Sequence, residues 1–216
     1  MKREVKITKD GSTTFYVPEL GEHYNSHFGA IQESSHIFID SALKQIDKEE
    51  INILEFGLGT ALNALQTYNY AKKNGLRINY CGVEKYPLLE DEYSQLNYPN
   101  NAILSEIHNA EWDKEFRIDD NFKIIKLKSD FVDLILNENN YDVVFFDAFA
   151  PDVQPHLWTL QIFQKIYKAM KIGGVLTTYT VKGSVRRIMK EAGFQVEKIP
   201  GPPGKREISR AWKKRV

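Results

Sequence analysis

Residues 141–158 read Tyr141-Asp-Val-Val-Phe-Phe-Asp-Ala-Phe-Ala-Pro-Asp-Val-Gln-Pro-His-Leu-Trp158. The unbroken apolar run 143–146 is typical of a central parallel strand that is covered on both faces. The run ends at Asp147, and Pro151 and Pro155 interrupt a simple continuation as strand or helix. Ligands of open α/β sheets bind beyond the carboxyl ends of the strands, so Asp147 is a candidate for chemistry. The position alone also allows an alternative, in which Asp147 only caps the next turn.

A second strand is followed by a glycine turn and a helix. Residues 51–56 form the strand, Gly57-Leu-Gly-Thr-Ala-Leu-Asn63 follows, and a helical pattern continues to Ala71. Glycines let a backbone approach a ligand, and a helix N-terminus presents free N–H groups, although a tight turn alone would also use them. The dinucleotide fingerprint needs a third glycine where this chain has Leu62, which disfavours a nicotinamide enzyme. The turn resembles instead the S-adenosylmethionine-binding turn of class I methyltransferases.

Two further acids follow predicted strands. Residues 76–83 form a strand that ends at Glu84, whose two carboxylate oxygens can accept both hydroxyls of a ribose. Residues 122–127 form another strand, and Asp130 follows it at a position that in this fold commonly lies near an adenine. The alternative for Glu84 is an ordinary surface position.

Strands and helices alternate through five units and end in a pair of strands, which predicts a doubly wound α/β sheet. We expect the fold of a class I (Rossmann-like) methyltransferase, with a seven-stranded, mostly parallel sheet and helices on both faces. The whole chain, 1–216, is expected to be one domain. It comprises an extension at 1–45 that covers the cofactor and a core at 51–216 with a helical insertion at about 87–117. Helices are also expected at 34–44 and 131–137.

Composition sets limits on function. The chain has 216 residues, of which 42% are hydrophobic and 27% charged, as in ordinary globular proteins. Cys81 is the single cysteine, and no Cys/His cluster has zinc spacing, so neither a disulfide nor a metal site is expected. No signal region or membrane-spanning segment is apparent, which favours the cytoplasm.

The net charge is zero, but residues 182–216 carry eleven Lys or Arg against three Asp or Glu. This segment suggests an anionic partner, or else a solvated surface.

Several motifs together resemble one family. Phe146-Asp-Ala-Phe-Ala-Pro-Asp-Val-Gln-Pro-His-Leu-Trp-Thr159 closely resembles the Asp-[Gly/Ala]-Phe-Ala-Pro-x-x-x-Pro-x-x-Trp-[Thr/Ser] signature of the MnmC-like methyltransferases. These form the methyltransferase half of the bifunctional tRNA 5-methylaminomethyl-2-thiouridine biosynthesis protein. The resemblance extends over most of the chain through segments 24–33, 55–63, 84–87, 183–194 and 204–207. Ala61 replaces a glycine of many members. The chain ends soon after Trp212, so we expect a stand-alone methyltransferase without the flavin-dependent oxidase half.

The resemblance implies S-adenosylmethionine-dependent N-methylation of 5-aminomethyl-(2-thio)uridine at the tRNA wobble position, without a metal. Asp147 would be the catalytic residue that orients the amine. The cofactor would be bound by Glu55, Gly57, Gly59, Thr60, Asn63, Glu84, Lys85, Asp130, Asp147, Glu33 and Tyr24. The tRNA substrate would be bound by Phe149, Pro151, Trp158, Lys182, Arg186, Arg187, Lys205 and Arg206. A separate oxidase or another enzyme would supply the aminomethyl group.

Two other classes of protein remain as alternatives to a tRNA methyltransferase. A methyltransferase or aminopropyltransferase-like enzyme acting on a small-molecule amine would need the cofactor residues but no basic surface. A non-catalytic RNA-binding module would need the basic surface but no cofactor pocket. The presence of Gly57, Gly59, Glu84 and Asp147 together argues against the second alternative.

Overall fold

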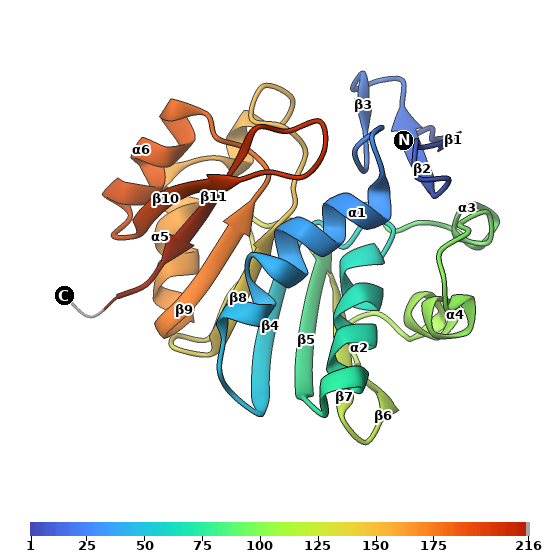
Figure 1. Ribbon diagram of the computed structural model, residues 1–216, viewed down its shortest axis with the longest axis horizontal. Helices are drawn as coiled ribbons and strands as arrows, with labels where there is room; N and C mark the ends of the chain where they lie inside the picture. The colour runs from blue at the N-terminus through green and yellow to red at the C-terminus, as the bar shows by residue number, and fades with distance from the viewer. Residues whose placement is uncertain (215–216) are drawn as a thin grey trace.

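The computed structural model describes residues 1–214 and contains a large mixed sheet (Figure 1). Its eight strands lie in the order β10-β11-β9-β8-β4-β5-β7-β6. In chain order these are β4 (Glu50–Phe56), β5 (Arg77–Glu84), β6 (Glu115–Asp119), β7 (Phe122–Lys128), β8 (Tyr141–Phe146), β9 (Met170–Thr178), β10 (Gln195–Pro200) and β11 (Glu207–Trp212). Strands β7, β5, β4, β8 and β9 are parallel, and β11 runs antiparallel between β9 and β10. The predicted mostly parallel sheet with a final antiparallel insertion is confirmed.

The eighth strand, β6, comes from the segment that was expected to be a helical insertion. That segment does contain two helices, α3 (Glu90–Tyr93) and α4 (Asn101–Asn109). Residues Glu115–Asp119 then pair antiparallel with β7 at the edge of the sheet. Phe116 and Ile118 pack against the core, while Arg117 between them is exposed. This alternation has the period of a strand, and it extends the predicted seven strands by one.

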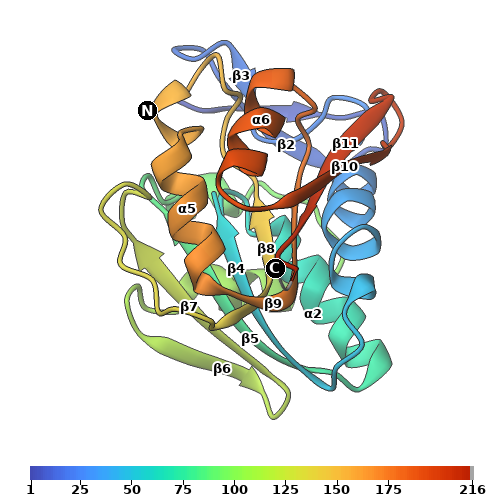
Figure 2. The same ribbon diagram turned by 90° about the vertical axis from the view of Figure 1, so that its left-hand side faces the viewer.

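Helices cover both faces of the sheet, as predicted (Figure 2). One face carries α1 (Ala30–Ser34), the π-helix η1 (Ser35–Asp40) and α2 (Leu62–Asn74), and the other carries α5 (Leu160–Ala169) and α6 (Gly183–Glu191). Strand β8 is buried along its whole length because both of its faces are covered.

Two of the helices predicted from sequence differ in the structure. Residues 34–44 form the end of α1, the π-helix η1 and the start of the 3-10 helix η2 (Leu43–Gln45), not one α-helix. Residues 131–133 form a turn and residues 134–137 have no regular secondary structure, although Phe131 and Leu134 are buried in the core as an amphipathic helix would bury them. A segment of seven residues gains few helical hydrogen bonds, so tertiary packing decides its conformation.

A small N-terminal sheet lies near the carboxyl ends of the main parallel strands (Figure 1, upper right). It consists of β1 (Glu4–Ile7), β2 (Thr13–Val17) and β3 (Glu22–His23), all antiparallel. The insertion holds it in place. The Thr13 N–H donates to Asn97 Oδ1 at 2.7 Å, and the Tyr98 hydroxyl donates to the Thr13 carbonyl at 2.9 Å. The chain segment before the core thereby reaches the edge of the sheet where ligands of α/β proteins bind.

Candidate functional site

A cavity of about 430 Å³ lies at the carboxyl ends of β4, β5 and β8, and residues of the N-terminal segment form part of its wall. Most of the predicted site residues line this cavity. They are Tyr24, Glu33, Gly57, Gly59, Thr60, Asn63, Glu84, Lys85, Asp130, Asp147, Phe149 and Lys205. Residues far apart in sequence therefore meet around one hollow of the size of a small-molecule site.

The glycine turn after β4 is packed against the turn after β8. Gly57 has φ +88°, and a Cβ atom added there would lie 2.6 Å from the carbonyl oxygen of Asp147. The Asp147 N–H in turn donates to the Phe56 carbonyl at 2.9 Å. Only a glycine combines this backbone conformation with so close an approach. Gly57 therefore sets the distance between the turn and the acid predicted to act in chemistry.

Glu84 is fixed at the end of β5 by two backbone N–H groups. Oε2 accepts from Gly59 at 3.1 Å, and Oε1 accepts from Tyr86 at 2.8 Å. Burial raises the pKa of this carboxyl above its ordinary value, and the two hydrogen bonds oppose that rise. Each carboxylate oxygen keeps capacity to accept from a ligand hydroxyl.

Lys85 and Asp130 form an ion pair at the wall of the cavity, with Nζ 2.6 Å from Oδ2. Burial alone would raise the pKa of Asp130. The hydrogen bonds from Lys85 and from the Val132 N–H outweigh that effect and hold the pKa below its ordinary value. The pair joins the loops that follow β5 and β7, the position where sequence predicts the adenine end of a cofactor.

Asp147 is held by an amide of helix α2. Asn63 Nδ2 donates to Asp147 Oδ2 at 2.9 Å and to Glu55 Oε1 at 2.7 Å, and the Ser34 hydroxyl donates to Asn63 Oδ1 at 2.6 Å. Glu55 is wholly buried, also accepts from the Tyr80 hydroxyl at 2.8 Å, and does not line the cavity. It was predicted to bind cofactor, but the structure places it behind Asn63, where it can only orient the amide.

The carboxyl of Asp147 has an unusual proton affinity. Its pKa is raised to about 7, mainly by burial and also by the charge of Glu33, against the lowering effects of the Asn63 hydrogen bond and the charge of Lys205. At neutral pH the group is therefore divided between acid and carboxylate. Such a group can both accept and release a proton, as general acid–base catalysis requires.

An ion pair closes the side of the cavity beyond Asp147. Lys205 Nζ lies 2.5 Å from Glu33 Oε1, and the Ser26 N–H donates to Glu33 Oε2 at 2.6 Å. Lys205 also lies over the Tyr179 ring, at 5.4 Å from its centroid. The pair connects the N-terminal segment to the loop before β11.

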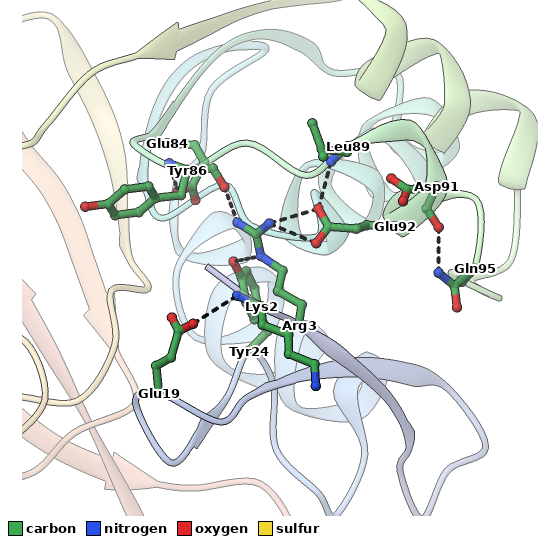
Figure 3. A network of polar contacts seen from close by, with 10 residues as sticks. All are labelled: Lys2, Arg3, Glu19, Tyr24, Glu84, Tyr86, Leu89, Asp91, Glu92 and Gln95. Atoms are coloured by element: carbon green, nitrogen blue, oxygen red, sulfur yellow. Dashed lines mark hydrogen bonds and ion pairs between the residues drawn. The ribbon is translucent and has the colours of Figure 1, made fainter.

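Tyr24 forms another part of the wall. A Cβ atom added at Gly59 would lie 2.9 Å from the Tyr24 ring, and that ring meets Phe149 edge-on with centroids 5.2 Å apart. Figure 3 shows the Tyr24 hydroxyl beside the guanidinium of Arg3. Tyr24 thus spans from the glycine turn to the loop after β8.

The remaining residues predicted to bind substrate do not line this cavity, namely Pro151, Trp158, Lys182, Arg186, Arg187 and Arg206. Trp158 is buried, and its indole N–H donates to the Phe149 carbonyl at 2.9 Å, so it holds the aromatic loop from the core side.

A second, shallow hollow is lined by Lys182, Lys205 and Arg206, and it shares Tyr179 and Lys205 with the first. Arg187 is exposed, and Arg186 Nε donates to the Val181 carbonyl at 3.2 Å. The predicted basic segment ends with Arg215 and Val216, which lie outside the described residues.

Sequence reasoning missed two residues of the site. Tyr179 lines both hollows, and its hydroxyl donates to the Ala148 carbonyl at 3.0 Å. Arg3 contacts the wall of the cavity from outside through Tyr24. Tyr179 follows the last residue of β9 and could have been found by the strand-end rule that identified Asp147. Arg3 lies in no sequence motif and follows no predicted strand, so nothing in the sequence indicated its contact with the site.

Within residues 1–214, no group of three or more His, Cys, Asp and Glu side chains is arranged to hold a metal ion. Over the same residues, none of the helices has the length and apolarity that crossing a bilayer requires.

The sheet order and the position of the cavity define a class I (Rossmann-like) methyltransferase fold. Spermidine synthase from Thermotoga maritima shares this fold at 14% identity with a TM-score of 0.59, over 97% of this chain and 71% of that one. A family model described as S-adenosyl-L-methionine-dependent methyltransferase matches residues 96–214, more than half of the chain. The chain belongs to this family of S-adenosylmethionine-dependent enzymes.

Relatives and a solved structure agree with the resemblance seen in the motifs. MNMC2 from Aquifex aeolicus superimposes with a TM-score of 0.82 at 26% identity, over 100% of this chain and 72% of that one. The tRNA 5-methylaminomethyl-2-thiouridine biosynthesis bifunctional protein MnmC of Nitrosospira multiformis is 30% identical over 89% of this chain. The protein of the same name from Cupriavidus metallidurans is 26% identical over 97% of it. The chain spans 34% of the length of each of these two relatives. The resemblance to MnmC-like methyltransferases is thus confirmed.

Proposed function

We propose that this protein methylates the amine of 5-aminomethyl-(2-thio)uridine at the wobble position of tRNA and gives 5-methylaminomethyl-(2-thio)uridine. The observation that carries the proposal is Asp147, which faces the cofactor cavity beside the glycine turn with a pKa raised to about 7. The names of the two bacterial relatives, both for tRNA 5-methylaminomethyl-2-thiouridine biosynthesis, supply the class of substrate.

The cavity has the groups that S-adenosylmethionine requires. In the proposed arrangement Glu84 accepts from the ribose hydroxyls, and the Lys85–Asp130 pair lies at the adenine end. The first turn of α2 has no side-chain cap, so its free N–H groups can receive the carboxylate of the methionine part. Thr60 and Asn63 border that turn. Tyr24 and Glu33 cover the cofactor from the N-terminal segment, while Glu55 acts through Asn63.

The residues around Asp147 then direct the transfer. S-adenosylmethionine supplies a methyl group on a positively charged sulfur, which leaves as a neutral thioether. A primary amine is mostly protonated at neutral pH, so the Asp147 carboxylate first accepts one proton from the ammonium. The freed lone pair forms the N–C bond as the C–S bond breaks, and the product carries its charge on nitrogen. Asn63 keeps Asp147 aligned, which matters because displacement requires nitrogen, methyl and sulfur in line.

The tRNA would approach from the side of Tyr179 and Lys205. A wobble base must leave the anticodon stack to enter the cavity, where Phe149 would form a wall with Pro151 beside it. The shallow second hollow, lined by Lys182, Lys205 and Arg206, adjoins the cavity at that side. Cations there suit the phosphates that flank an extruded nucleotide, and Arg186 and Arg187 extend the basic surface.

The proposal places the protein in the cytoplasm, where tRNA is modified. It also requires that the aminomethyl group is already in place on the uridine before the methyl transfer. We propose that a separate oxidase or another enzyme provides this substrate.

Transfer of labelled methyl groups from S-adenosylmethionine tests the proposal. The acceptors are tRNA with 5-aminomethyluridine at the wobble position, the same tRNA without the modification, and small primary amines. Label on the aminomethyl tRNA alone is expected. Label on free amines but not on tRNA would replace the proposal with a small-molecule amine acceptor. The carboxylates of Asp147 and Glu33 in the cavity would also suit such an acceptor.

A further inference from the structure

We propose that Arg3 is a positioning residue for cofactor binding, which holds Tyr24 over the glycine turn and joins it to the loop after Glu84. The guanidinium donates in three directions (Figure 3). Nε donates to the Tyr24 hydroxyl at 2.8 Å, Nη2 donates to the Tyr86 carbonyl at 2.5 Å, and Nη1 donates to both carboxylate oxygens of Glu92 at 3.0 and 2.8 Å. Only 5% of the Arg3 side chain is exposed.

Two of these contacts belong to different parts of the cofactor site. Tyr24 packs on Gly59 in the turn after β4. Tyr86 follows β5, and its N–H holds Glu84 Oε1 at 2.8 Å. One guanidinium therefore connects the wall above the glycine turn with the loop that fixes the proposed ribose acceptor. Both groups also line the cavity, whereas Arg3 itself does not.

Glu92 makes the burial of Arg3 possible. Its Oε2 also accepts from the Leu89 N–H at 2.8 Å at the start of α3, so the carboxylate is itself held in place. A buried cation without such a partner would be costly. The rigid planar fork of arginine can serve three acceptors at once, which the single ammonium of lysine cannot do in the same geometry.

Burial raises the pKa of Tyr24 to about 12, so its hydroxyl stays neutral and remains an acceptor for Arg3 Nε. The Arg3 guanidinium also lies 5.7 Å from the Tyr24 ring centroid, close enough for a cation–π contact. The ring is therefore restrained at its hydroxyl and over its face. Release of Arg3 would leave Tyr24 free to move from the glycine turn, and the cofactor would escape faster.

The test measures binding of S-adenosylhomocysteine to the full chain by calorimetry and its release by stopped flow. Arg3→Lys keeps a cation beside Glu92 but loses the fork, and Arg3→Gln with Glu92→Gln removes both charges. We expect each to raise Kd about tenfold, the effect of one lost charge-assisted hydrogen bond, mainly through faster release. Lys6→Ala, in β1 with an exposed ion pair to Glu4, is the matched control and should leave Kd unchanged.

A cycle with Tyr24→Phe separates positioning from a merely structural role. If Arg3 acts through the hydroxyl, Arg3→Lys should raise Kd much less in the Tyr24→Phe background than in the parent. Full additivity of the two effects would overturn the proposal. So would an Arg3→Lys protein that melts at a lower temperature but binds the cofactor product with the parent Kd. The readout is binding, so the result does not depend on the identity of the methyl acceptor.

Discussion

Glu55 and Asp147 accept hydrogen bonds from the same atom, Nδ2 of Asn63, at 2.7 and 2.9 Å. The two hydrogens of one amide are therefore both used, one toward the core and one toward the cavity. Burial raises the pKa of Glu55 well above its ordinary value, which favours a neutral core partner. The Asn63 amide thus links Glu55, which does not line the cavity, to Asp147, which is proposed to accept a proton from the amine.

Asn63→Asp should remove this link with little change in shape. An aspartate oxygen cannot donate to either carboxyl and adds a third acid beside two others. We expect turnover at pH 7 to fall about tenfold to a hundredfold, since a hydrogen bond to a charged group contributes about 1.5–3 kcal/mol. The acidic limb of the pH–rate profile should also move to higher pH. Asn69→Asp, on the same helix but in an exposed contact with Asn100, is the control and should retain parent kinetics.

Asp147→Ala should bind S-adenosylmethionine with near-parent affinity and lose turnover. The reason is that Asp147 is assigned to the acceptor amine, while Glu84 and the glycine turn are proposed to hold the cofactor. Equilibrium binding and single-turnover methyl transfer on the aminomethyl tRNA measure the two effects separately. A folded variant that no longer binds the cofactor would contradict the assignment.

Asp147→Asn should stabilise the protein in a pH-dependent way. The pKa of Asp147 is raised from 3.8 to about 7 by burial. The stability linked to the neutral form is fully present below pH 3.8 and is lost as pH rises through about 7. The asparagine variant never ionises, so its melting temperature should exceed that of the parent at pH 8 and match it at pH 4. Asp133→Asn, at an exposed acid, should show no such divergence.

The ion pair between Glu33 and Lys205 should tune the proton affinity of Asp147 in opposite directions. Glu33 raises the pKa of Asp147 and Lys205 lowers it. Glu33→Gln should therefore move the acidic limb of the pH–rate profile to lower pH, and Lys205→Met should move it to higher pH. Lys198→Met, which breaks an exposed pair with Glu207, should leave the limb in place. Shifts of the same sign in both variants would show that the pair acts through geometry instead of charge.

Alanine substitutions at two glycines with positive φ would distinguish the cost of backbone strain from the cost of a steric clash. A Cβ atom at Gly75, with φ +67°, meets nothing within 4 Å, whereas one at Gly57, with φ +88°, meets the Asp147 carbonyl oxygen at 2.6 Å. Gly75→Ala should cost on the order of 1–2 kcal/mol of unfolding free energy. Gly57→Ala should cost about 1–3 kcal/mol more, because the turn after β8 must shift. Chemical denaturation measures both, and Gly57→Ala alone should also impair methyl transfer.

The parts of the site that could be predicted from sequence are those that follow strands. Gly57, Glu84 and Asp147 each stand where an apolar run stops, and the parallel sheet brings these ends to one edge. That rule needs only local patterns and the order of the elements. It predicts the edge on which residues meet, but it does not predict which side chains bond to one another.

The residues that sequence misplaced or missed depend on packing between distant segments. Trp158 belongs to the signature loop, yet its ring turns into the core and holds the loop through Phe149. Glu55 lies next to the glycine turn but points to Tyr80 and Asn63. Arg3 reaches Glu92 across 89 positions of sequence. A shift of one residue along a strand would exchange inward and outward sides, so local patterns alone could not fix these orientations.

The position of β11 inside the sheet has a consequence for how the chain is made. The strands whose carboxyl ends lead to the cavity, β4, β5, β7 and β8, are complete by residue 146. Strand β9 pairs with β8 on one side, and its other side stays unpaired until β11 (Glu207–Trp212) has been made. Strand β10 pairs only with β11 among the described strands. During synthesis at the ribosome, the strands already made therefore form a partial sheet with an unpaired edge strand. Such an edge can pair with strands of other chains. Slow elongation over the codons for residues 147–212 would prolong that exposure, and the yield of folded protein in cells should depend on it.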